Sequence, residues 1–324
     1  MSKRVFITGA SGCVGHYLTE TLLLNTDYEL FLLVRDRQKL TIDVKRRPGV
    51  EVIEADMADI DRFHELLQTI DIAVLTAAAW GGAEATQQVN VQQVVTLLSS
   101  LDPERCQQVI YFSTESVLGH NNELLPEAAL YGTDYIRTKY QGLQEIENLA
   151  IAPKVTAVFP TLVFGGGSDG KRSSFLTAGL QDVVKWLWLI RFFKGEASFH
   201  IVHAYDIAQV VRYLIAHPPA EPGVRKFVLG TSAITLDDAV RQACDYFGLR
   251  IWFQIPLTRG LVDFFIKVFR IQMTDWDRFC INYRHFTHTN PVNPAQFGMV
   301  PYVNSLADLF RVSGFKSRQR LSVK

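Results

Sequence analysis

The sequence predicts an α/β protein with a doubly wound parallel sheet and a smaller C-terminal lobe. Short apolar runs alternate with segments of helical length through the first half of the chain, which is typical of strands joined by crossover helices. These runs also lack strict alternation with polar residues, as expected for strands that are buried on both faces. With 324 residues, of which 48% are hydrophobic, the chain can form one large domain or two closely packed ones.

Six apolar runs have the length of buried strands, and four segments between them have the length and pattern of helices. The expected strands are Arg4–Thr8, Glu29–Val34, Val50–Glu54, Ile72–Thr76, Gln108–Ser113 and Val155–Phe159. The expected helices are His16–Leu24, Ile60–Gln68, Val89–Leu101 and Asp134–Leu149.

A glycine turn follows the first strand, with Gly9, Gly12 and Gly15 spaced as G-x-x-G-x-x-G. The first glycine allows a tight turn, the second lets the backbone approach a pyrophosphate, and the third lets the helix pack closely on the sheet. The helix N-terminus then offers free N–H groups to phosphates. Such a turn can also serve packing alone, but its place directly after the first strand favours nucleotide binding in a Rossmann-type sheet.

The second half of the chain is less regular. Two further strands are expected at Phe199–His203 and Lys226–Leu229, with a helix at Ile207–Ala216 between them. We therefore expect residues 1–164 to form a dinucleotide-binding Rossmann-type domain, to whose sheet residues 199–232 return. The remaining segments should build a substrate-binding lobe over the carboxyl edge of the sheet, where ligands bind in this fold class. These segments are residues 165–198 and 233–324.

Composition and charge limit the classes of partner. The formal net charge is zero, which argues against nucleic acid as the main partner. No run reaches the ~18 uninterrupted apolar residues of a transmembrane helix. His285 and His288 lie three residues apart without a third ligand, so no metal site is expected. The cysteines are scattered without a C-x-x-C pair, which fits reduced thiols in the cytoplasm; they are Cys13, Cys106, Cys244 and Cys280.

A possible acid–base pair lies on one predicted helix. Tyr135 and Lys139 are four residues apart and so share a helix face. A tyrosine needs a nearby cation to act near neutral pH, and Lys139 can supply it and also bind ribose hydroxyls. Thr114 ends a strand at the same edge of the sheet and can hydrogen-bond a substrate oxygen. The alternative is a chance pair on a helix surface and a hydroxyl that caps a turn.

Together these motifs resemble the extended short-chain dehydrogenase/reductase family, which contains nucleotide-sugar epimerases, dehydratases, dihydroflavonol-type reductases and 3β-hydroxysteroid dehydrogenases. The loop Thr8–Gly15 matches the family, as do the Y-x-x-x-K pair and the strand end Ser113–Gly119. The resemblance covers about residues 3–232 in order and is closest to the dihydroflavonol-reductase and 3β-hydroxysteroid-dehydrogenase type. It implies that Thr114, Tyr135 and Lys139 are catalytic.

Further segments extend the resemblance around the expected cofactor. Asp56 follows the third strand, where the family places an acid near the adenine, and Asn90 matches the asparagine that begins a family helix. Thr76–Ala79, Pro160–Gly165 and His203–Ala208 resemble the segments under the ribose and phosphates, at the nicotinamide and at the return to the sheet. The resemblance implies these cofactor contacts: Thr8, Gly9, Ser11, Gly12, Cys13, Val14, Gly15, Arg35, Asp56, Met57, Thr76, Ala77, Ala78, Lys139, Pro160 and Val163.

The end of the second strand favours NADP(H) over NAD(H). Relatives that prefer NAD carry an acidic residue there for the 2′-hydroxyl, but this chain has Val34 followed by Arg35. A guanidinium suits a 2′-phosphate, and Arg37 or Lys39 can add charge. Alternatively Arg35 is solvated, Asp36 binds the ribose, and the cofactor is NAD(H).

The lobe predicts an apolar or aromatic substrate. Nucleotide-sugar relatives usually carry an arginine for the diphosphate before the return segment, and Phe199 or its neighbours stand there instead. We therefore expect an NADP(H)-dependent oxidoreductase, a cytoplasmic homodimer, that interconverts a carbonyl and a secondary alcohol on a small molecule. One alternative is an NAD-dependent nucleotide-sugar epimerase or dehydratase. Another is a non-catalytic NADP-binding regulatory protein.

Two apolar stretches, Val183–Phe193 and Leu257–Ile271, contain basic residues. A basic amphipathic helix can lie at a membrane surface, but burial explains most apolar helix faces. We therefore expect the second stretch to cover the substrate pocket, with peripheral membrane contact as the alternative.

Overall fold

Seven parallel strands form one central sheet in the computed structural model, which describes residues 2–167, 169–218 and 223–318. Along the sheet the order is β11-β6-β5-β4-β1-β2-β3. The strands are added in one direction from β1 to β3 and in the other from β4 onward, and a doubly wound sheet opens its ligand crevice at this switch point between β1 and β4. The predicted fold class is confirmed. The strands are β1 (Arg4–Thr8), β2 (Glu29–Val34), β3 (Val50–Glu54), β4 (Ile72–Leu75), β5 (Gln108–Phe112), β6 (Val155–Pro160) and β11 (Arg225–Leu229).

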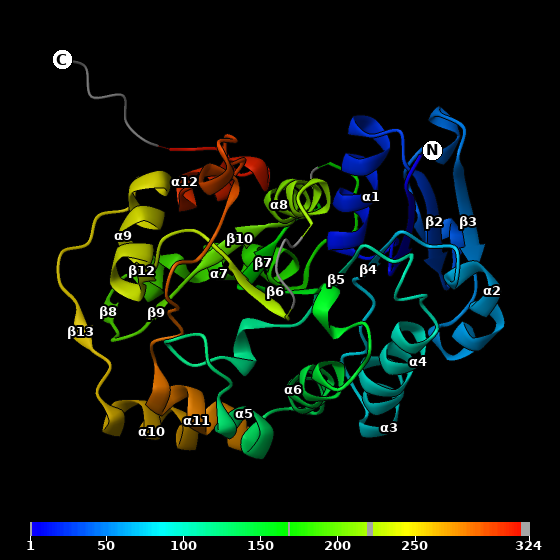
Figure 1. Ribbon diagram of the computed structural model, residues 1–324. Helices are drawn as coiled ribbons and strands as arrows, with labels where there is room; N and C mark the ends of the chain where they lie inside the picture. The colour runs from blue at the N-terminus through cyan, green and yellow to red at the C-terminus, as the bar shows by residue number, and fades with distance from the viewer. Residues whose placement is uncertain (1, 168, 219–222, 319–324) are drawn as a thin grey trace.

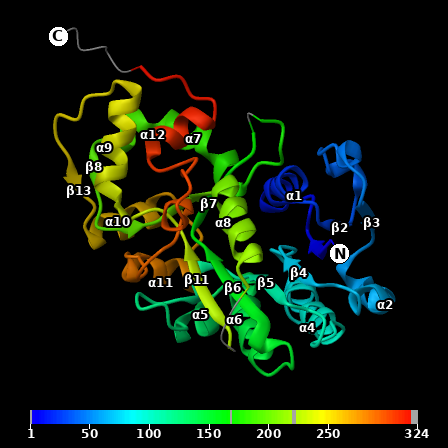
Figure 2. The same cartoon turned by 45° about the horizontal axis from the view of Figure 1, so that its top comes forward.

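Helices cover both faces of this sheet (Figures 1 and 2). Side chains alternate between the faces, so Val5 and Ile7 join one core and Phe6 joins the other. Helices α1 (Cys13–Asn25) and α8 (Ala204–Ala216) contribute to the first core, and α4 (Gln93–Ser99) and α6 (Asp134–Glu147) to the second. Two apolar cores thus fix the strands whose carboxyl ends carry the predicted site.

Two helices differ from the prediction. The segment expected as one helix at Val89–Leu101 divides into most of a π-helical turn (Gln88–Gln92) and α4, and the short helix α3 (Ala83–Gln87) precedes it. The helix expected at Ile60–Gln68 is α-helical only at α2 (His64–Leu67), and a 3₁₀ segment (Met57–Phe63) takes the place of its first part. Asp56 begins the 3₁₀ segment, where its carboxylate accepts from the N–H of Ala58 at 3.0 Å, as expected of a side chain that competes for backbone N–H groups.

The strand expected at Phe199–His203 is also divided. β9 (Ser198–Phe199) pairs with β12 (Ile234–Thr235), whereas β10 (Ile201–His203) pairs with β7 (Leu162–Phe164). Of the returning segment 199–232, therefore, β11 joins the central sheet and β10 does not. The division falls at His200, which turns its ring to the carbonyl of Thr231 at 2.8 Å.

Helices α7 (Phe175–Ile190), α9 (Leu236–Phe247) and α12 (Leu306–Val312) contribute to a third core, whereas Trp276 of the later helix α11 joins the core of α4 and α6. Asp206, at the start of α8, attaches the third core to the sheet domain by accepting from the N–H groups of Tyr302 (2.6 Å) and Val303 (3.0 Å), and burial raises the pKa of this carboxyl to about 6. The remaining elements are α5 (Pro126–Tyr131), β8 (Phe193–Lys194), β13 (Ile255–Pro256), α10 (Arg259–Val268) and α11 (Asp275–Tyr283), with short 3₁₀ turns at Arg37–Lys39, Val44–Arg46, Glu115–Val117, Ala152–Lys154 and Pro294–Phe297.

We predict that Gly15→Ala destabilises the protein, because a Cβ at this position would lie 2.1 Å from the carbonyl oxygen of Gly9. The backbone must move to relieve that contact, at a cost of about 2 kcal/mol or more. The measurement is the free energy of unfolding in urea. Gly179→Ala in α7 is the matched control, since its Cβ would enter open space, and alanine should stabilise that helix by up to about 1 kcal/mol. Unchanged stability in Gly15→Ala would contradict the close packing.

Candidate active site

Two threonines join the ends of β1 and β4. The hydroxyl of Thr76 donates to the carbonyl of Thr8 at 2.6 Å, and the N–H of Ala77 donates to the hydroxyl of Thr8 at 3.2 Å. Thr8 is fully buried. A Cβ at Gly9, which has a φ of +70°, would lie 2.7 Å from the amide nitrogen of Ala77. The two loops are therefore held in contact at the base of the crevice.

Helix α1 begins directly after the glycine turn. Gly12 supplies no side-chain cap, so the first amides of the helix face the turn as an anion site. Burial raises the pKa of the Cys13 thiol to about 12, which makes it a packing group rather than a nucleophile. A Cβ at Gly15 would strike the turn itself. These features fit the diphosphate of a dinucleotide, as predicted for this turn and for Ser11 and Val14 within it.

The loop after β7 lies against α1, a contact that the sequence did not predict. The hydroxyl of Tyr17 donates to the carboxylate of Asp169 at 2.5 Å and accepts from the N–H of Gly166 at 2.9 Å. Lys171 forms an ion pair with Glu20 on the same helix at 3.1 Å. The glycine-rich loop is thereby attached beside the anion site.

Asn90 joins the loop after β4 to helix α6. Its side-chain amide exchanges two hydrogen bonds with the backbone of Ala79, both 2.9 Å long, and donates a third to the hydroxyl of Thr138 at 3.0 Å. Asn90 is completely buried and lies in the π-helical turn, a distortion that is frequent at functional sites. This amide therefore positions the helix that carries the predicted acid–base pair.

The side chains of Tyr135 and Thr114 lie next to each other. Burial raises the pKa of Tyr135 above its usual range, and the neighbouring Thr114 hydroxyl opposes this rise. The indole of Trp80 stacks on the phenol ring, with centroids 4.0 Å apart and planes inclined by 12°. Because Trp80 is 73% exposed, it forms a wall between Tyr135 and solvent.

Lys139 lies one turn further along α6, on the same side as Tyr135. Its ammonium donates to the carbonyl of Phe112 at 2.8 Å and stands 5.0 Å from the ring centre of Tyr111. The residue is only 2% exposed, and burial lowers its pKa to about 7. No ion pair with a carboxylate stabilises it among the residues that the structure describes. The structure thus brings together Thr114, Tyr135 and Lys139, the three residues predicted to be catalytic.

A buried ionisable pair lies directly beside Thr114. Glu115 and His288 are both buried, with Oε2 of the carboxyl 3.3 Å from Nε2 of the ring, although the two atoms are not aligned as a hydrogen bond. The Nδ1–H of His288 donates to the carbonyl of Gly119 at 3.1 Å. Burial raises the pKa of Glu115, and His288 opposes the rise.

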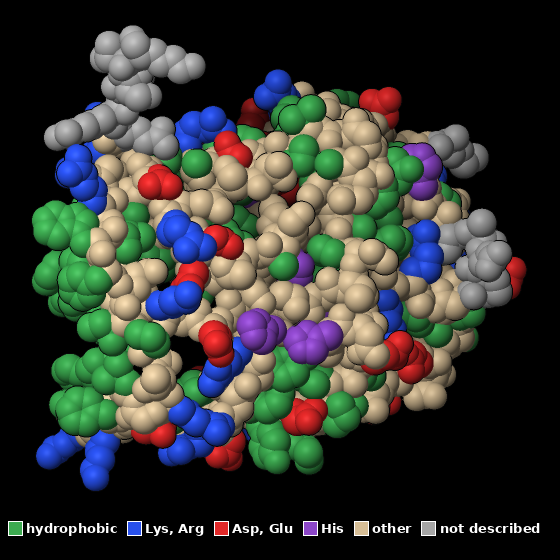
Figure 3. All heavy atoms as spheres, turned by 90° about the vertical axis from the view of Figure 1, so that its left-hand side faces the viewer, with side chains coloured by type: hydrophobic (Ala, Val, Ile, Leu, Met, Phe, Trp, Pro, Cys, Tyr) green, Lys and Arg blue, Asp and Glu red, His purple; other side chains and the backbone are tan. Residues whose placement is uncertain are grey.

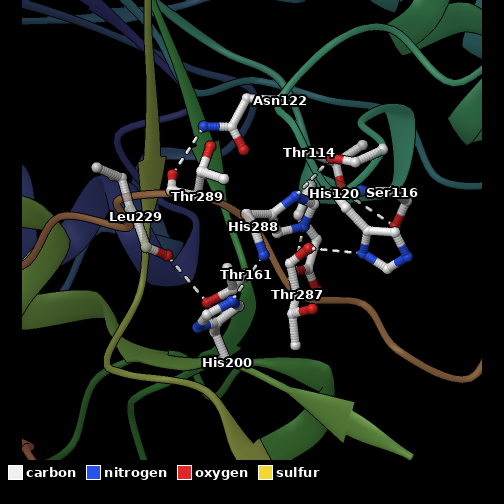
Figure 4. A network of polar contacts seen from close by, with 12 residues as sticks. Thr114, Ser116, His120, Asn122, Thr161, His200, Leu229, Thr287, His288 and Thr289 are labelled. Carbon is white, nitrogen blue, oxygen red and sulfur yellow. Dashed lines mark hydrogen bonds and ion pairs between the residues drawn. The ribbon is translucent and has the colours of Figure 1, made fainter.

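The C-terminal strap, residues 284–293, holds this pair in place (Figure 4). It contacts the loop after β5 through His120, whose ring nitrogen Nδ1 bonds the carbonyl of Thr287 at 3.0 Å, and through Asn122, which donates to the carbonyl of Thr289 at 2.8 Å. The N–H of His288 donates to Nε2 of His200 at 3.0 Å. The strap thus connects the loop that carries Thr114 to the C-terminal lobe.

Arg35 lies exposed at the end of β2 and forms no hydrogen bond or ion pair with any described residue. Asp36, the alternative ribose ligand, is engaged elsewhere, because its carboxylate accepts from the N–H of Gln38 at 2.9 Å and pairs with Lys39 at 3.3 Å. His16 connects the loop after β2 to the glycine turn, since its Nε2 accepts from the N–H of Thr41 at 3.2 Å and its Nδ1 bonds the carbonyl of Gly12 at 2.9 Å. The guanidinium is therefore free to meet a ligand at the crevice.

The other predicted cofactor contacts border the same edge of the sheet. Asp56 caps the 3₁₀ segment after β3, and Met57 beside it is buried. Pro160 ends β6, and Val163 lies in β7 opposite Val202. Ala78 continues the loop after β4 that Asn90 holds. Each lies at a carboxyl end of a strand or in the loop after it.

Sequence reasoning missed three residues of the site: Trp80, Glu115 and His288. Trp80 could have been found from the sequence, because it directly follows the Thr76–Ala79 segment that matches the family. His288 was considered only as a metal ligand, and its partner lies far away in the sequence. Among the described residues no group of three or more His, Cys, Asp or Glu side chains could hold a metal, and no helix in this part of the chain could cross a membrane.

Comparison with solved structures supports the fold. A structure described as gox2253 matches 98% of this chain and 100% of its own at 19% identity, with a TM-score of 0.69. WbmG from Bordetella bronchiseptica, in complex with NAD and UDP, matches 100% of both chains at 15% identity and a TM-score of 0.65. DesIV, a dTDP-glucose 4,6-dehydratase from Streptomyces venezuelae with NAD bound, matches 96% and 95% at 17% identity and 0.64.

Comparison with protein sequences gives one short local match and one broad match. An oxidase, ucsJ, of Acremonium sp. is 34% identical over 73 residues, and the match spans 21% of its length. The model of the NAD dependent epimerase/dehydratase family matches residues 5–230, which include the glycine turn, Thr114, Tyr135 and Lys139. The chain therefore belongs to the NAD-dependent epimerase/dehydratase family.

Proposed function

We propose that this protein is an NADP(H)-dependent oxidoreductase that interconverts a carbonyl and a secondary alcohol on a small apolar or aromatic compound. The observation that carries the proposal is the placement of Thr114 beside Tyr135, with Lys139 on the same helix side and the glycine turn at the same sheet edge. We further propose that the enzyme is a homodimer in the cytoplasm, in line with its scattered cysteines.

The residues of the site divide the work of reduction. When bound, NADPH supplies a hydride to the carbonyl carbon. Tyr135 gives its proton to the oxygen as negative charge develops there, acting as general acid, and recovers a proton from solvent. Thr114 donates a hydrogen bond to the same oxygen and orients the carbonyl. The ammonium of Lys139 lowers the pKa of Tyr135 and binds the nicotinamide ribose.

The proposed preference for NADP(H) rests on charge at the end of β2. The free guanidinium of Arg35 suits a 2′-phosphate, whereas Asp36 is held by Gln38 and Lys39. The carboxylate of Asp36 would repel a 2′-phosphate only if it faced the ribose of the cofactor.

The proposed substrate class rests on two aromatic residues. Trp80 stacks against Tyr135 and offers an apolar wall beside the reacting oxygen. Phe199, partly buried in β9, stands where a diphosphate would need a cation. Both favour an apolar or aromatic carbonyl compound over a nucleotide sugar.

The comparisons favour a second candidate, an epimerase or dehydratase that holds NAD and acts on a nucleotide sugar. The structures of WbmG and DesIV contain NAD, and the family description names these reactions. The same tyrosine would then serve an internal oxidation and reduction. Stoichiometric NAD released from the purified, denatured protein would support this candidate.

We predict that Tyr135→Phe lowers carbonyl turnover at least ~100-fold, because general acid catalysis contributes that much or more. NADPH binding, followed by fluorescence titration, should stay nearly unchanged. Tyr140→Phe is the matched control, since Tyr140 lies in the same helix outside the acid–base pair. Equal turnover in the two variants would refute the role of Tyr135.

We predict that Arg35→Ser weakens NADPH binding about tenfold or more and leaves NADH binding nearly unchanged, because a charge-assisted bond to the 2′-phosphate is lost. The control is Arg46→Ser, because Arg46 is an exposed arginine farther along the chain, in the 3₁₀ turn Val44–Arg46. The measurement is the dissociation constant of each cofactor. An equal effect of Arg35→Ser on both cofactors would show that Arg35 does not read the 2′-phosphate.

A further inference from the structure

Large apolar side chains gather on one exposed surface of the C-terminal lobe, which we call the hydrophobic face. It spans the end of α7, the β8–β13 pair, α10 and the turn after α10. Figure 3 shows hydrophobic side chains gathered along one margin of the side of the molecule that carries α9, β13 and α10. The exposed members of the face are Val183, Trp186, Trp188, Leu189, Trp252, Phe253, Ile255, Phe264, Val268, Phe269 and Ile271.

Helix α10 is the clearest part of the hydrophobic face. It was expected to cover the substrate pocket with a buried apolar side, but no residue of α10 is buried. Phe264 is 57% exposed, and Phe269, which ends the helix, is 69% exposed. Leu261, Val262, Phe265 and Ile266 are half-buried, so burial within this chain accounts for only part of the apolar surface of the helix.

The hydrophobic face has a fixed shape. Ile255 in β13 pairs with Phe193 in β8, and its N–H donates to the carbonyl of Phe192 at 2.8 Å. The rings of Phe192 and Phe253 stack with centroids 4.9 Å apart, and Phe193 meets Phe265 of α10 edge to face at 6.1 Å. The exposed rings are thus presented on a supported surface.

The hydrophobic face also carries an excess of positive charge, although the whole chain is neutral. Between residues 257 and 271 the charged side chains are Arg259, Lys267 and Arg270 against the single acid Asp263. Lys267 and Arg270 are exposed, and neither has an ion-pair partner among the described residues. These cations, Lys267 and Arg270, lie beside aromatic rings. Together they complement a partner with an apolar interior and anionic groups on its surface.

We propose that the hydrophobic face docks the protein onto an anionic lipid surface, with α10 lying in the plane of the membrane interface. Tryptophan and phenylalanine enter the boundary between headgroups and acyl chains, while lysine and arginine meet anionic headgroups. A second copy of this chain fits less well, because a self-complementary contact through this face would bring the same cations together. The proposal does not depend on which reaction the enzyme catalyses.

The test is flotation of the full-length protein with phosphatidylcholine vesicles, with and without phosphatidylserine. Wild-type protein should float with the anionic vesicles, and added salt should weaken binding because it screens the cations. The double variant Phe264→Ser/Phe269→Ser should lose at least about tenfold in partition coefficient, since two rings leave the apolar phase. Lys267→Glu/Arg270→Glu should lose at least about tenfold on anionic vesicles alone.

Val300→Ser is the matched control, since Val300 is a strongly exposed apolar residue outside the hydrophobic face, and it should bind as wild type does. Thermal unfolding shows whether each variant is folded; a blue shift of tryptophan emission on vesicle addition gives a second readout from Trp252 and its neighbours. Wild-type protein that stays unbound on both kinds of vesicle overturns the proposal. The proposal is also overturned if the wild-type protein forms a dimer, does not bind vesicles, and becomes a monomer in the Phe264→Ser/Phe269→Ser variant.

Discussion

The buried ammonium of Lys139 is the constraint on which the arrangement of the site depends. A charge that is taken out of water needs partners, and this one has the carbonyl of Phe112 and the ring of Tyr111. Asn90 holds the same helix through Thr138. The helix is therefore fixed against the carboxyl end of β5, and Tyr135 on it faces Thr114. A low pKa of about 7 means that an approaching anion can charge this lysine near neutral pH.

The C-terminal lobe contributes to this arrangement as well as covering it. Glu115 and His288 share a buried contact beside Thr114, and the strap carries its bonds to His200 and to the loop after β5. A change in the lobe can therefore reach the hydroxyl of Thr114, which we propose orients the substrate carbonyl. The hydrophobic face belongs to the same lobe, so docking on a lipid surface would place the enzyme where apolar carbonyl compounds accumulate.

The sequence alone was enough to predict the bounds of several strands. The strands Arg4–Thr8 and Glu29–Val34 have the bounds expected from their apolar runs, because burial on both faces leaves a continuous signal. The edge strand Val50–Glu54 also has the expected bounds, although no residue in it is fully buried. The family motifs predicted Thr114, Tyr135 and Lys139 in the same way. The contacts of Tyr17 with Asp169 and of His288 with Gly119 join residues 152 and 169 positions apart, and no spacing rule relates such positions. The exposed rings of α10 could not be predicted for a different reason: periodicity shows an apolar side, but not how much of it other elements cover.

The most direct test of the account is the titration of Lys139 followed by NMR on lysine labelled at Cε, with Lys139→Met to assign the signal. The account predicts a pKa near 7 in the protein alone, and a clear rise when NADPH binds, because the phosphates and ribose hydroxyls favour the charged amine. A signal that titrates at the ordinary value of 10.5 with and without NADPH would contradict it, since the ammonium would then be neither buried nor part of the cofactor site.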